Sequence, residues 1–170
     1  MNHLKLNHLL MIVIVILISL LVYLLTGRGD KIPFIKLADV YKEFKLTKEL
    51  DTKYSEIETK KKNTLDSLDF EAKKYGASAN YNSALYQVMV QNYINRRSEF
   101  EKSSEELSQM YEDMIWKQIN TYTEKYGIDN NYEYILGAQG SGTVMYANPQ
   151  NDITKEFIEY LNKSYEGKTK

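Results

Sequence analysis

The chain of 170 residues contains no cysteine, and its two histidines, His3 and His8, both lie within the first eight residues. The absence of cysteine excludes disulfides, thiolate metal sites and cysteine nucleophiles. No histidine follows His8, so a histidine-based catalytic or metal site in the rest of the chain is excluded too. The formal net charge is only −1, which gives the molecule no strong field toward nucleic acid or an anionic membrane. With two prolines and eight glycines, the sequence leaves room for long helices.

A long hydrophobic run lies near the N-terminus. Leu9 to Leu25 form an uncharged run of 17 residues. This is short for a membrane-spanning helix but longer than the usual hydrophobic region of a signal peptide. The residues that follow it offer no pair of small side chains with the spacing that signal peptidase requires. We therefore predict an uncleaved transmembrane anchor, residues 9–26, preceded by a short tail, residues 1–8.

Two long segments have the apolar periodicity of helices. In residues 38–75 and 83–126 an apolar side chain recurs every three or four positions, mostly with polar residues between. Residues 76–82 indicate a turn, and Gly127 is a favourable residue at which to end the second helix. Long helices with such narrow apolar stripes fit an antiparallel coiled-coil hairpin, residues 38–127. Polar residues, Lys60 to Asn63 among them, interrupt the apolar stripe in its distal part, so we expect a loosely packed and mobile tip.

Short strands flank the two long helices. Residues 31–37 predict one strand, and residues 132–138 and 143–147 predict two more. A last helix, residues 154–165, is expected to cover the strands, with Thr154 at its N-cap and Ile153 and Ile158 forming a hydrophobic staple. The predicted fold class is α+β, mostly α. It consists of a long helical hairpin on a small β body formed by residues 27–37 and 128–170.

The charges of the hairpin are unevenly distributed. Residues 59–97 hold seven basic residues against three acidic ones, a net charge of +4. Residues 39–58 and 98–116, nearer the body, have net charges of −2 and −5. Two interpretations stay open: a coiled coil whose charges only solvate it, and an electrostatic capture surface at the tip. Clustered like charges at a tip cost stability, which favours some role for them.

The segment "YILGAQGSGTVMYANP", residues 134–149, contains Gly137, Gly140 and Gly142. A phosphate-binding loop would need a lysine and a hydroxyl after the glycines and a helix opening behind them. Here a predicted strand follows, and no lysine occurs between Lys125 and Lys155. We therefore interpret the segment as a β-hairpin whose glycines form the turn.

No other group of residues predicts catalysis. Neighbouring carboxylates such as Glu105 and Glu106 lie on predicted exposed helix faces, where no cleft would perturb their pKa values. The serines have no histidine to activate them. We expect no enzymatic activity, no cofactor, no metal site, no small-molecule substrate and no nucleic-acid partner.

The order of predicted elements, with "KIPFIKLADVYKEF" before the helices and "YILGAQGSGTVMYANPQNDITKEFIEYLN" after them, resembles the Skp/OmpH family of periplasmic chaperones. The resemblance implies a homotrimer in which strands of each subunit build a central β-barrel and helical hairpins extend as tentacles around a cavity. It implies ATP-independent binding of unfolded outer-membrane proteins in that cavity. It also implies that the body is exported to the periplasm, with the predicted anchor in the inner membrane and residues 1–8 in the cytoplasm.

The resemblance also implies roles for particular residues. The assembly body would be formed by Ile32, Phe34, Ile35, Tyr134, Ile135, Leu136, Val144, Met145 and Tyr146, with the turn at Gly137, Gly140 and Gly142. The client-binding residues are expected on the hairpin, at Lys60, Lys61, Lys62, Lys73, Lys74, Tyr75, Tyr81, Tyr86, Met89, Tyr93, Arg96 and Arg97.

A second hypothesis for the function is structural. A membrane-anchored coiled coil could instead act as a spacer or adaptor that binds a single folded partner. Crosslinking distinguishes the two hypotheses, because a chaperone has many unfolded clients and an adaptor has one stoichiometric partner.

Overall fold

The computed structural model describes residues 11–22, 32–139 and 144–167. The chain divides into two compact units, Met1–Ile32 and Pro33–Lys170. In the first unit, residues 11–22 are helical. The rest of the expected anchor (residues 9–10 and 23–26) and the tail (residues 1–8) lie outside the described residues. Among the helices that are described, none has the length and hydrophobicity needed to span a membrane.

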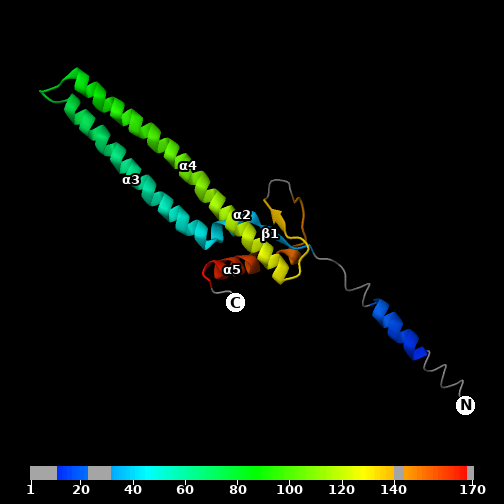
Figure 1. The fold of residues 1–170 in the computed structure, drawn as a ribbon. Coiled ribbons are helices and arrows are strands. Elements are labelled where there is room, and N and C mark those ends of the chain that lie inside the picture. Colours follow the sequence, from blue (N-terminus) through cyan, green and yellow to red (C-terminus); the bar gives the residue numbers. More distant parts are fainter. Residues whose placement is uncertain (1–10, 23–31, 140–143, 168–170) are drawn as a thin grey trace, which may run out of the picture. The chain divides into compact units, whose positions relative to one another are not determined.

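The second unit is mostly α-helical, with a small two-stranded sheet. Two long helices, α3 (Lys45–Gly76) and α4 (Ser83–Asp129), run side by side and are joined by a short turn (Figure 1). We call α3 and α4 the helix pair, and the end at the turn its distal end. Asn82 caps α4 by accepting hydrogen bonds from the N–H groups of Ala84 and Leu85. Both helices and the turn between them are confirmed, whereas their supercoiling stays a prediction.

The hydrophobic core lies at the end of the helix pair opposite the turn. It is built from Ile35 of the first strand, β1 (Phe34–Lys36), Phe44, Ile115 and Ile119 of α4, and Phe157 of the last helix, together with Val40, Leu46, Leu50, Tyr126 and Leu161. Between Leu50 and Ile115, Ala72 is the only buried hydrophobic residue among those described. Among the described residues, the buried hydrophobic core lies between Phe34 and Leu161, and residues 28–170 therefore include all of this core and the unit Pro33–Lys170.

A short helix, α2 (Leu37–Glu43), precedes α3 and is separated from it by an extended residue, Phe44. The sequence predicted one uninterrupted helix from residue 38, which is wrong at this point. The break places the Phe44 ring in the core, fully buried and 5.5 Å from the Tyr165 ring in a T-shaped contact. Full burial of a phenylalanine side chain stabilises the fold by about 1.5–3 kcal/mol relative to leaving it exposed.

The sheet consists of β1 (Phe34–Lys36) and β2 (Leu136–Ala138), which pair in parallel with Ile35 opposite Gly137. The strand at β1 is confirmed, and so is part of the predicted strand at residues 132–138. The predicted hairpin partner is not, because residues 144–147 form no strand and β2 pairs with β1 instead. A parallel pair needs a long connection, and the helix pair supplies it.

Two predicted helix ends are also wrong in detail. Helix α4 continues through Gly127 to Asp129, and the positive φ near its end belongs to Asn131, at 54°. Helix α5 (Thr154–Tyr165) has the predicted bounds, but its N-cap residue is Ile153. The Thr154 hydroxyl instead accepts a hydrogen bond from the backbone N–H of Lys36 at 2.9 Å, which ties α5 to the end of β1.

Candidate interaction surfaces

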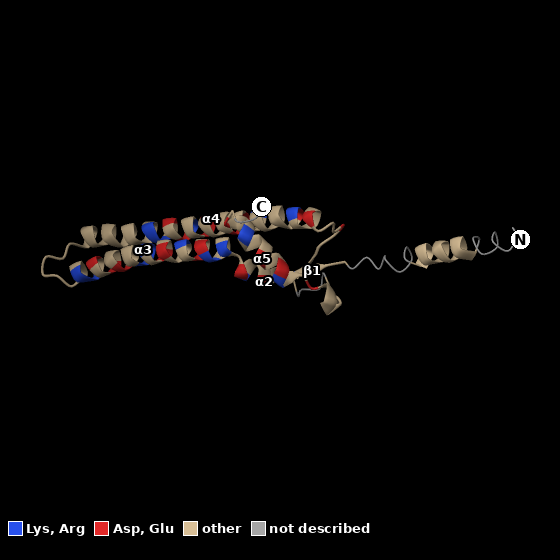
Figure 2. Ribbon diagram, turned by 90° about the horizontal axis from the view of Figure 1, so that it is seen from below, with Lys and Arg blue, Asp and Glu red and all other residues tan. Residues whose placement is uncertain are grey.

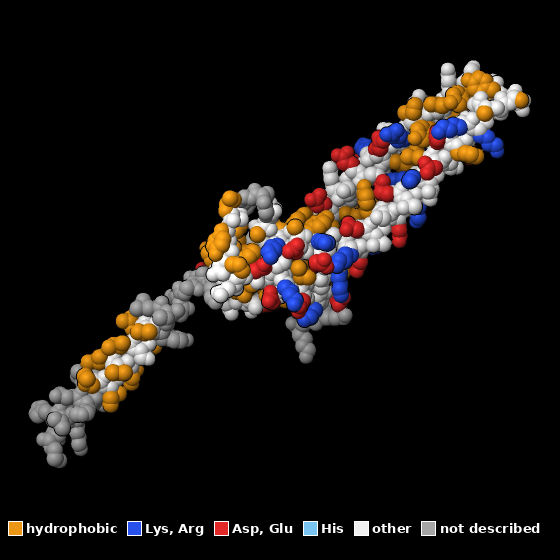
Figure 3. Space-filling view, turned by 180° about the vertical axis from the view of Figure 1, so that it is seen from behind, with side chains coloured by type: hydrophobic (Ala, Val, Ile, Leu, Met, Phe, Trp, Pro, Cys, Tyr) orange, Lys and Arg blue, Asp and Glu red, His pale blue; other side chains and the backbone are white. Residues whose placement is uncertain are grey.

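The distal half of the helix pair exposes large apolar side chains. Phe70 of α3 is 66% exposed and Val88 of α4 is 64% exposed, and Leu85 and Ile94 are exposed as well. Figure 3 shows hydrophobic side chains gathered at the distal end of the pair. Because this half has almost no buried core, these side chains have no interior to enter. Exposed apolar side chains clustered on a surface, as here on the helix pair, are typical of a surface that contacts another molecule.

The distal part of α4 also lacks charge. Residues 83–95 contain no acidic or basic side chain, and the distal end of α4 is accordingly free of both colours in Figure 2. The basic residues predicted for the tip therefore lie on α3 or further along α4, at Arg96 and Arg97. The tip of the helix pair thus combines a neutral, apolar α4 with a charged α3.

Besides Lys61, three of the predicted basic residues form ion pairs within their own helix. Lys73 contacts Asp69 at 2.7 Å, Arg96 contacts Glu99 at 3.0 Å and Arg97 contacts Glu101 at 2.8 Å. The hydrogen bond that Lys73 donates to Asp69 and the negative charge of that carboxylate raise the pKa of Lys73. These partners offset part of the basic field expected at the tip. Client binding by the tip lysines and arginines stays a prediction.

Lys61 does not lie on the surface where the sequence placed it. Its side chain is only 14% exposed, and its ammonium donates hydrogen bonds across the helix pair to Ser104 Oγ at 2.7 Å and to the Phe100 carbonyl at 3.4 Å. Within α3 it pairs with Glu58 at 3.1 Å. The Ser104 hydroxyl donates to Glu58 at 2.6 Å and, with Lys61, lowers the pKa of that carboxyl although burial raises it. Lys61 therefore connects α3 to α4 and is poorly placed to bind a client.

The predicted tyrosines of the tip hold the turn together. The rings of Tyr75 and Tyr81 are 6.4 Å apart, and those of Tyr81 and Tyr86 are 5.7 Å apart. The Tyr75 hydroxyl donates to the Asn80 carbonyl and accepts from the Asn82 N–H. Tyr81 is 49% exposed, whereas Tyr75 and Tyr86 are half-buried. The ring cluster thus has a structural role at the turn and leaves Tyr81 as its accessible member.

The predicted assembly residues divide into two groups. Phe34 and Ile35 are buried inside their own chain, and Ile135 packs against the same core. Tyr134, Leu136, Met145 and Tyr146 are exposed, as is Ile32, and Val144 is half-buried. Met145 and Tyr146 are 88% and 82% exposed, more than any other large hydrophobic residue described. Of the predicted assembly residues, only the exposed ones are accessible for contact with another chain.

Gly137 is not a turn residue. It lies in β2, where a Cβ atom would be 2.8 Å from Leu37 Cδ1. The role of this glycine is the close approach of β2 to the first residue of α2. Gly140 and Gly142 lie outside the described residues.

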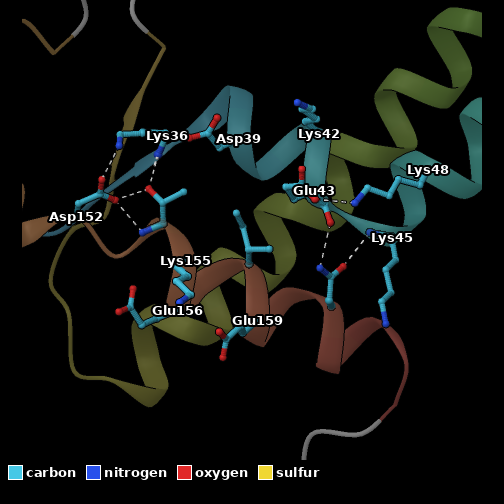
Figure 4. A pocket seen from close by; sticks show the side chains of 13 residues that line it. Lys36, Asp39, Lys42, Glu43, Lys45, Lys48, Asp152, Lys155, Glu156 and Glu159 are labelled. Atoms are coloured by element: carbon cyan, nitrogen blue, oxygen red, sulfur yellow. Dashed lines mark hydrogen bonds and ion pairs between the residues drawn. The ribbon is translucent and has the colours of Figure 1, made fainter.

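A groove of about 880 Å³ lies between α2 and α5, lined by charged side chains of both signs (Figure 4). Lys36 contacts Asp152 at 2.8 Å, and Lys48 contacts Glu43 at 2.6 Å. Burial raises the pKa of Asp152, but hydrogen bonds from Lys36 and from the Thr154 hydroxyl and N–H outweigh it and lower the pKa overall. The groove contains no cluster of one charge sign, so it does not define an ion-binding site.

Comparison with known families identifies the chain. The family model of OmpH-like outer membrane proteins matches residues 31–161, which cover the whole core and the helix pair. The chain belongs to the OmpH-like family. A comparison with curated proteins finds no match. Membership of the OmpH-like family implies a chaperone-type function in the periplasm and binding of outer-membrane protein clients.

Sequence reasoning missed part of the exposed surface that this OmpH-like chain presents. The predicted apolar faces of the two long helices include Leu85 and Val88 but neither Phe70 nor Ile94. The available signal was local: Phe70 and Ile94 each lie one or two positions away from a residue of the periodic apolar stripe. An apolar residue off the stripe of a two-helix arrangement has no second neighbour to cover it.

Proposed function

We propose that this protein is an ATP-independent holdase that binds unfolded outer-membrane proteins through the helix pair. The observation that carries the proposal is the exposure of Phe70, Leu85 and Val88 on a helix pair that has almost no core of its own. Family membership supports the same conclusion at a coarser level. In this proposal the chain is not an enzyme and needs no cofactor.

The physical basis of the activity is weak, distributed contact. An unfolded client exposes apolar side chains that would otherwise associate with one another. The uncharged distal part of α4, residues 83–95, offers apolar contact to such chains without demanding a particular sequence. The nearby basic residues Lys60, Lys62 and Lys74 are exposed and add attraction to acidic segments. Because each contact is weak, the client leaves when it folds elsewhere.

We further propose that the protein acts as a homotrimer assembled through the β body. The exposed side chains of Met145 and Tyr146, which follow β2 in the chain, support an assembly surface in the β body. In a trimer the three helix pairs would surround the client. Light scattering on residues 28–170 gives the mass of the assembly, and a monomer at micromolar concentration would contradict this part of the proposal.

The proposed location is the periplasm, with residues 9–26 anchoring the chain in the inner membrane. The uncharged run Leu9 to Leu25 and the exposed apolar side chains of residues 11–22 support this placement. Alkaline extraction of membranes from cells that produce the full chain tests the anchor. Release of the chain into the supernatant would contradict it.

Aggregation of a denatured outer-membrane β-barrel tests the holdase activity directly. Residues 28–170, added at a stoichiometric amount as the barrel is diluted from urea, are expected to suppress the rise in light scattering. Unchanged aggregation would contradict the proposal. Crosslinking in the periplasm then separates a chaperone, with many unfolded clients, from the alternative of an adaptor with one folded partner.

A further inference from the structure

Four exposed apolar side chains of α4 lie on the same flank of the helix. Leu85, Val88, Met110 and Met114 are 43–64% exposed. Each immediately precedes a residue that points toward the rest of the unit: Tyr86, Met89, Tyr111 and Ile115, which are half-buried or buried. Successive residues of an α-helix are separated by about 100° around its axis. Each of the four side chains is therefore offset by about 100° around the helix axis from an inward-facing side chain, in the same direction of rotation, so all four lie on one flank of α4. Ile94 follows the half-buried Tyr93 and so lies on the opposite flank.

The four residues form two separate apolar pairs. Leu85 and Val88 are three positions apart, and Met110 and Met114 are four positions apart, so the members of each pair are neighbours on the helix surface. We call them the distal pair and the proximal pair. Methionine adapts its shape to different apolar partners, which suits a surface that binds varied sequences.

The flank between the two pairs is polar but locally neutralised. Its residues again precede inward positions and are Asn92, Glu99, Ser103 and Glu106. Glu99 is paired with Arg96 at 3.0 Å, and Glu106 is 3.8 Å from Lys102. A bound chain would cross this stretch without meeting an uncompensated charge or an apolar patch.

The separation of the pairs indicates the kind of ligand that reaches both. Val88 and Met110 are 22 residues apart in one helix, which corresponds to about 33 Å at 1.5 Å per residue. An extended polypeptide spans that distance with about ten residues at about 3.3 Å per residue. An unfolded segment with apolar side chains at such a spacing can contact both pairs at once.

We propose that this flank captures one extended client segment at two points, the distal pair and the proximal pair. The inference rests on the proposed holdase function and adds the geometry of client recognition to it. Engagement of the second pair is intramolecular once the first is bound, so affinity rises without any new kind of contact. The flank therefore selects unfolded segments whose apolar groups are about ten residues apart.

Synthetic peptides with a stiff spacer test the geometry. Each carries one Leu-Phe anchor at either end of an oligoproline spacer, which extends by about 3.1 Å per residue. Fluorescence anisotropy with residues 28–170 gives the Kd for spacers of 5, 11 and 17 residues. We expect binding with the spacer of 11 residues to be at least tenfold tighter than with the spacer of 5 or with a single-anchor peptide. Equal Kd values for all three spacers would overturn the inference.

Variants then assign the two points. Leu85→Ser/Val88→Ser and Met110→Ser/Met114→Ser should each reduce the affinity for the 11-residue spacer to that of the single-anchor peptide. Ile128→Ser, at an exposed apolar residue of α4 that belongs to neither pair, is the matched control and should leave the Kd unchanged. An equal loss in the Ile128→Ser variant would overturn the assignment to the two pairs.

The experiment separates the inference from the function on which it rests. If residues 28–170 suppress aggregation of a denatured barrel but show no preference for spacer length, the two-point capture is wrong and the holdase function stands. If aggregation is not suppressed, the proposed function itself fails.

Discussion

The side chain of Asn162 in α5 forms hydrogen bonds on both sides of the break between α2 and α3. Its Oδ1 accepts from the backbone N–H of Lys45 at 2.8 Å, and its Nδ2 donates to the Glu43 carbonyl at 3.1 Å (Figure 4). These backbone groups flank Phe44, whose ring is fully buried. One amide from a distant helix thus supplies bonds that a continuous helix would have formed within itself.

Replacement of Asn162 should therefore weaken the α2–α3 junction. We expect Asn162→Ala to lower the free energy of unfolding by about 1–2 kcal/mol, because two hydrogen bonds to exposed backbone are lost. Urea unfolding of residues 28–170 followed by circular dichroism measures the change. Lys163→Ala, at the exposed neighbouring position, is the control, and equal urea midpoints for the two variants would contradict the prediction.

The close contact between Gly137 and Leu37 predicts a second effect. In Gly137→Ala the new methyl group meets Leu37 Cδ1 at 2.8 Å and Cγ at 3.1 Å. We expect a loss of about 1–3 kcal/mol in the free energy of unfolding, as for an overpacked site. Leu37→Ala removes the obstructing atoms, so the double variant should be more stable than the sum of the single effects implies. Additive effects in this double-mutant cycle would show that the contact is not the cause.

The cross-helix hydrogen bonds of Lys61 predict a local loss of protection. Lys61→Ala removes the contacts to Glu58, Ser104 and the Phe100 carbonyl, and we expect amide hydrogen exchange to become faster in the distal half of α3 and α4. The adjacent Lys62 is exposed, so Lys62→Ala serves as the control. A similar increase in the exchange rate in both variants would show that the loss of a positive charge, and not the loss of the hydrogen bonds from Lys61 to α4, causes the effect.

The contact between Tyr165 and Glu49 predicts a dependence of stability on alkaline pH. The hydrogen bond to Glu49 at 2.7 Å, together with burial, raises the pKa of Tyr165 from 10.0 to about 12. The unfolded chain then loses this proton at a lower pH than the folded chain does. The contribution of Tyr165 is present below pH 10 and is lost as the pH rises from 10 to 12.

Measurement of this dependence requires a variant without the phenol. Urea unfolding of Tyr165→Phe and of the unmodified chain, at pH values from 8 to 12, should show a shallower decline for the variant above pH 10. Absorbance at 295 nm should show that Tyr165→Phe lacks one tyrosine that ionises near pH 12. Parallel stability curves for the two proteins would contradict the assignment.

Several elements follow from local sequence alone. Asn82 and the apolar periodicity after it determine where α4 begins, because capping and helix formation depend on residues within a few positions of each other. The bounds of α5, Thr154–Tyr165, agree with the prediction for the same reason. Tyr134 and Met145, two of the predicted assembly residues, are exposed, and their role in assembly stays a prediction.

Other features depended on contacts between residues far apart in the chain. The break at Phe44 exists because that ring and Asn162 of α5 meet there, and no window of local sequence contains both. Lys61 belongs to a run of three lysines in the sequence, and only the tertiary structure places Ser104 and the Phe100 carbonyl opposite it. Gly137 is likewise explained only by Leu37, about a hundred positions away in the sequence.

The sequence by itself determined which long segments are mostly helical, where the long helices turn, and which family the chain resembles, since periodicity and motifs are local properties. Tertiary structure decided which strand pairs with β1 and which lysine lies between the helices. It also decided which apolar side chains remain uncovered. The physical reason is that the burial and the hydrogen-bond partners of a side chain depend on the helix or strand that packs against it. Two helices alone cannot cover every face of each other, so Leu85 and Val88 remain exposed.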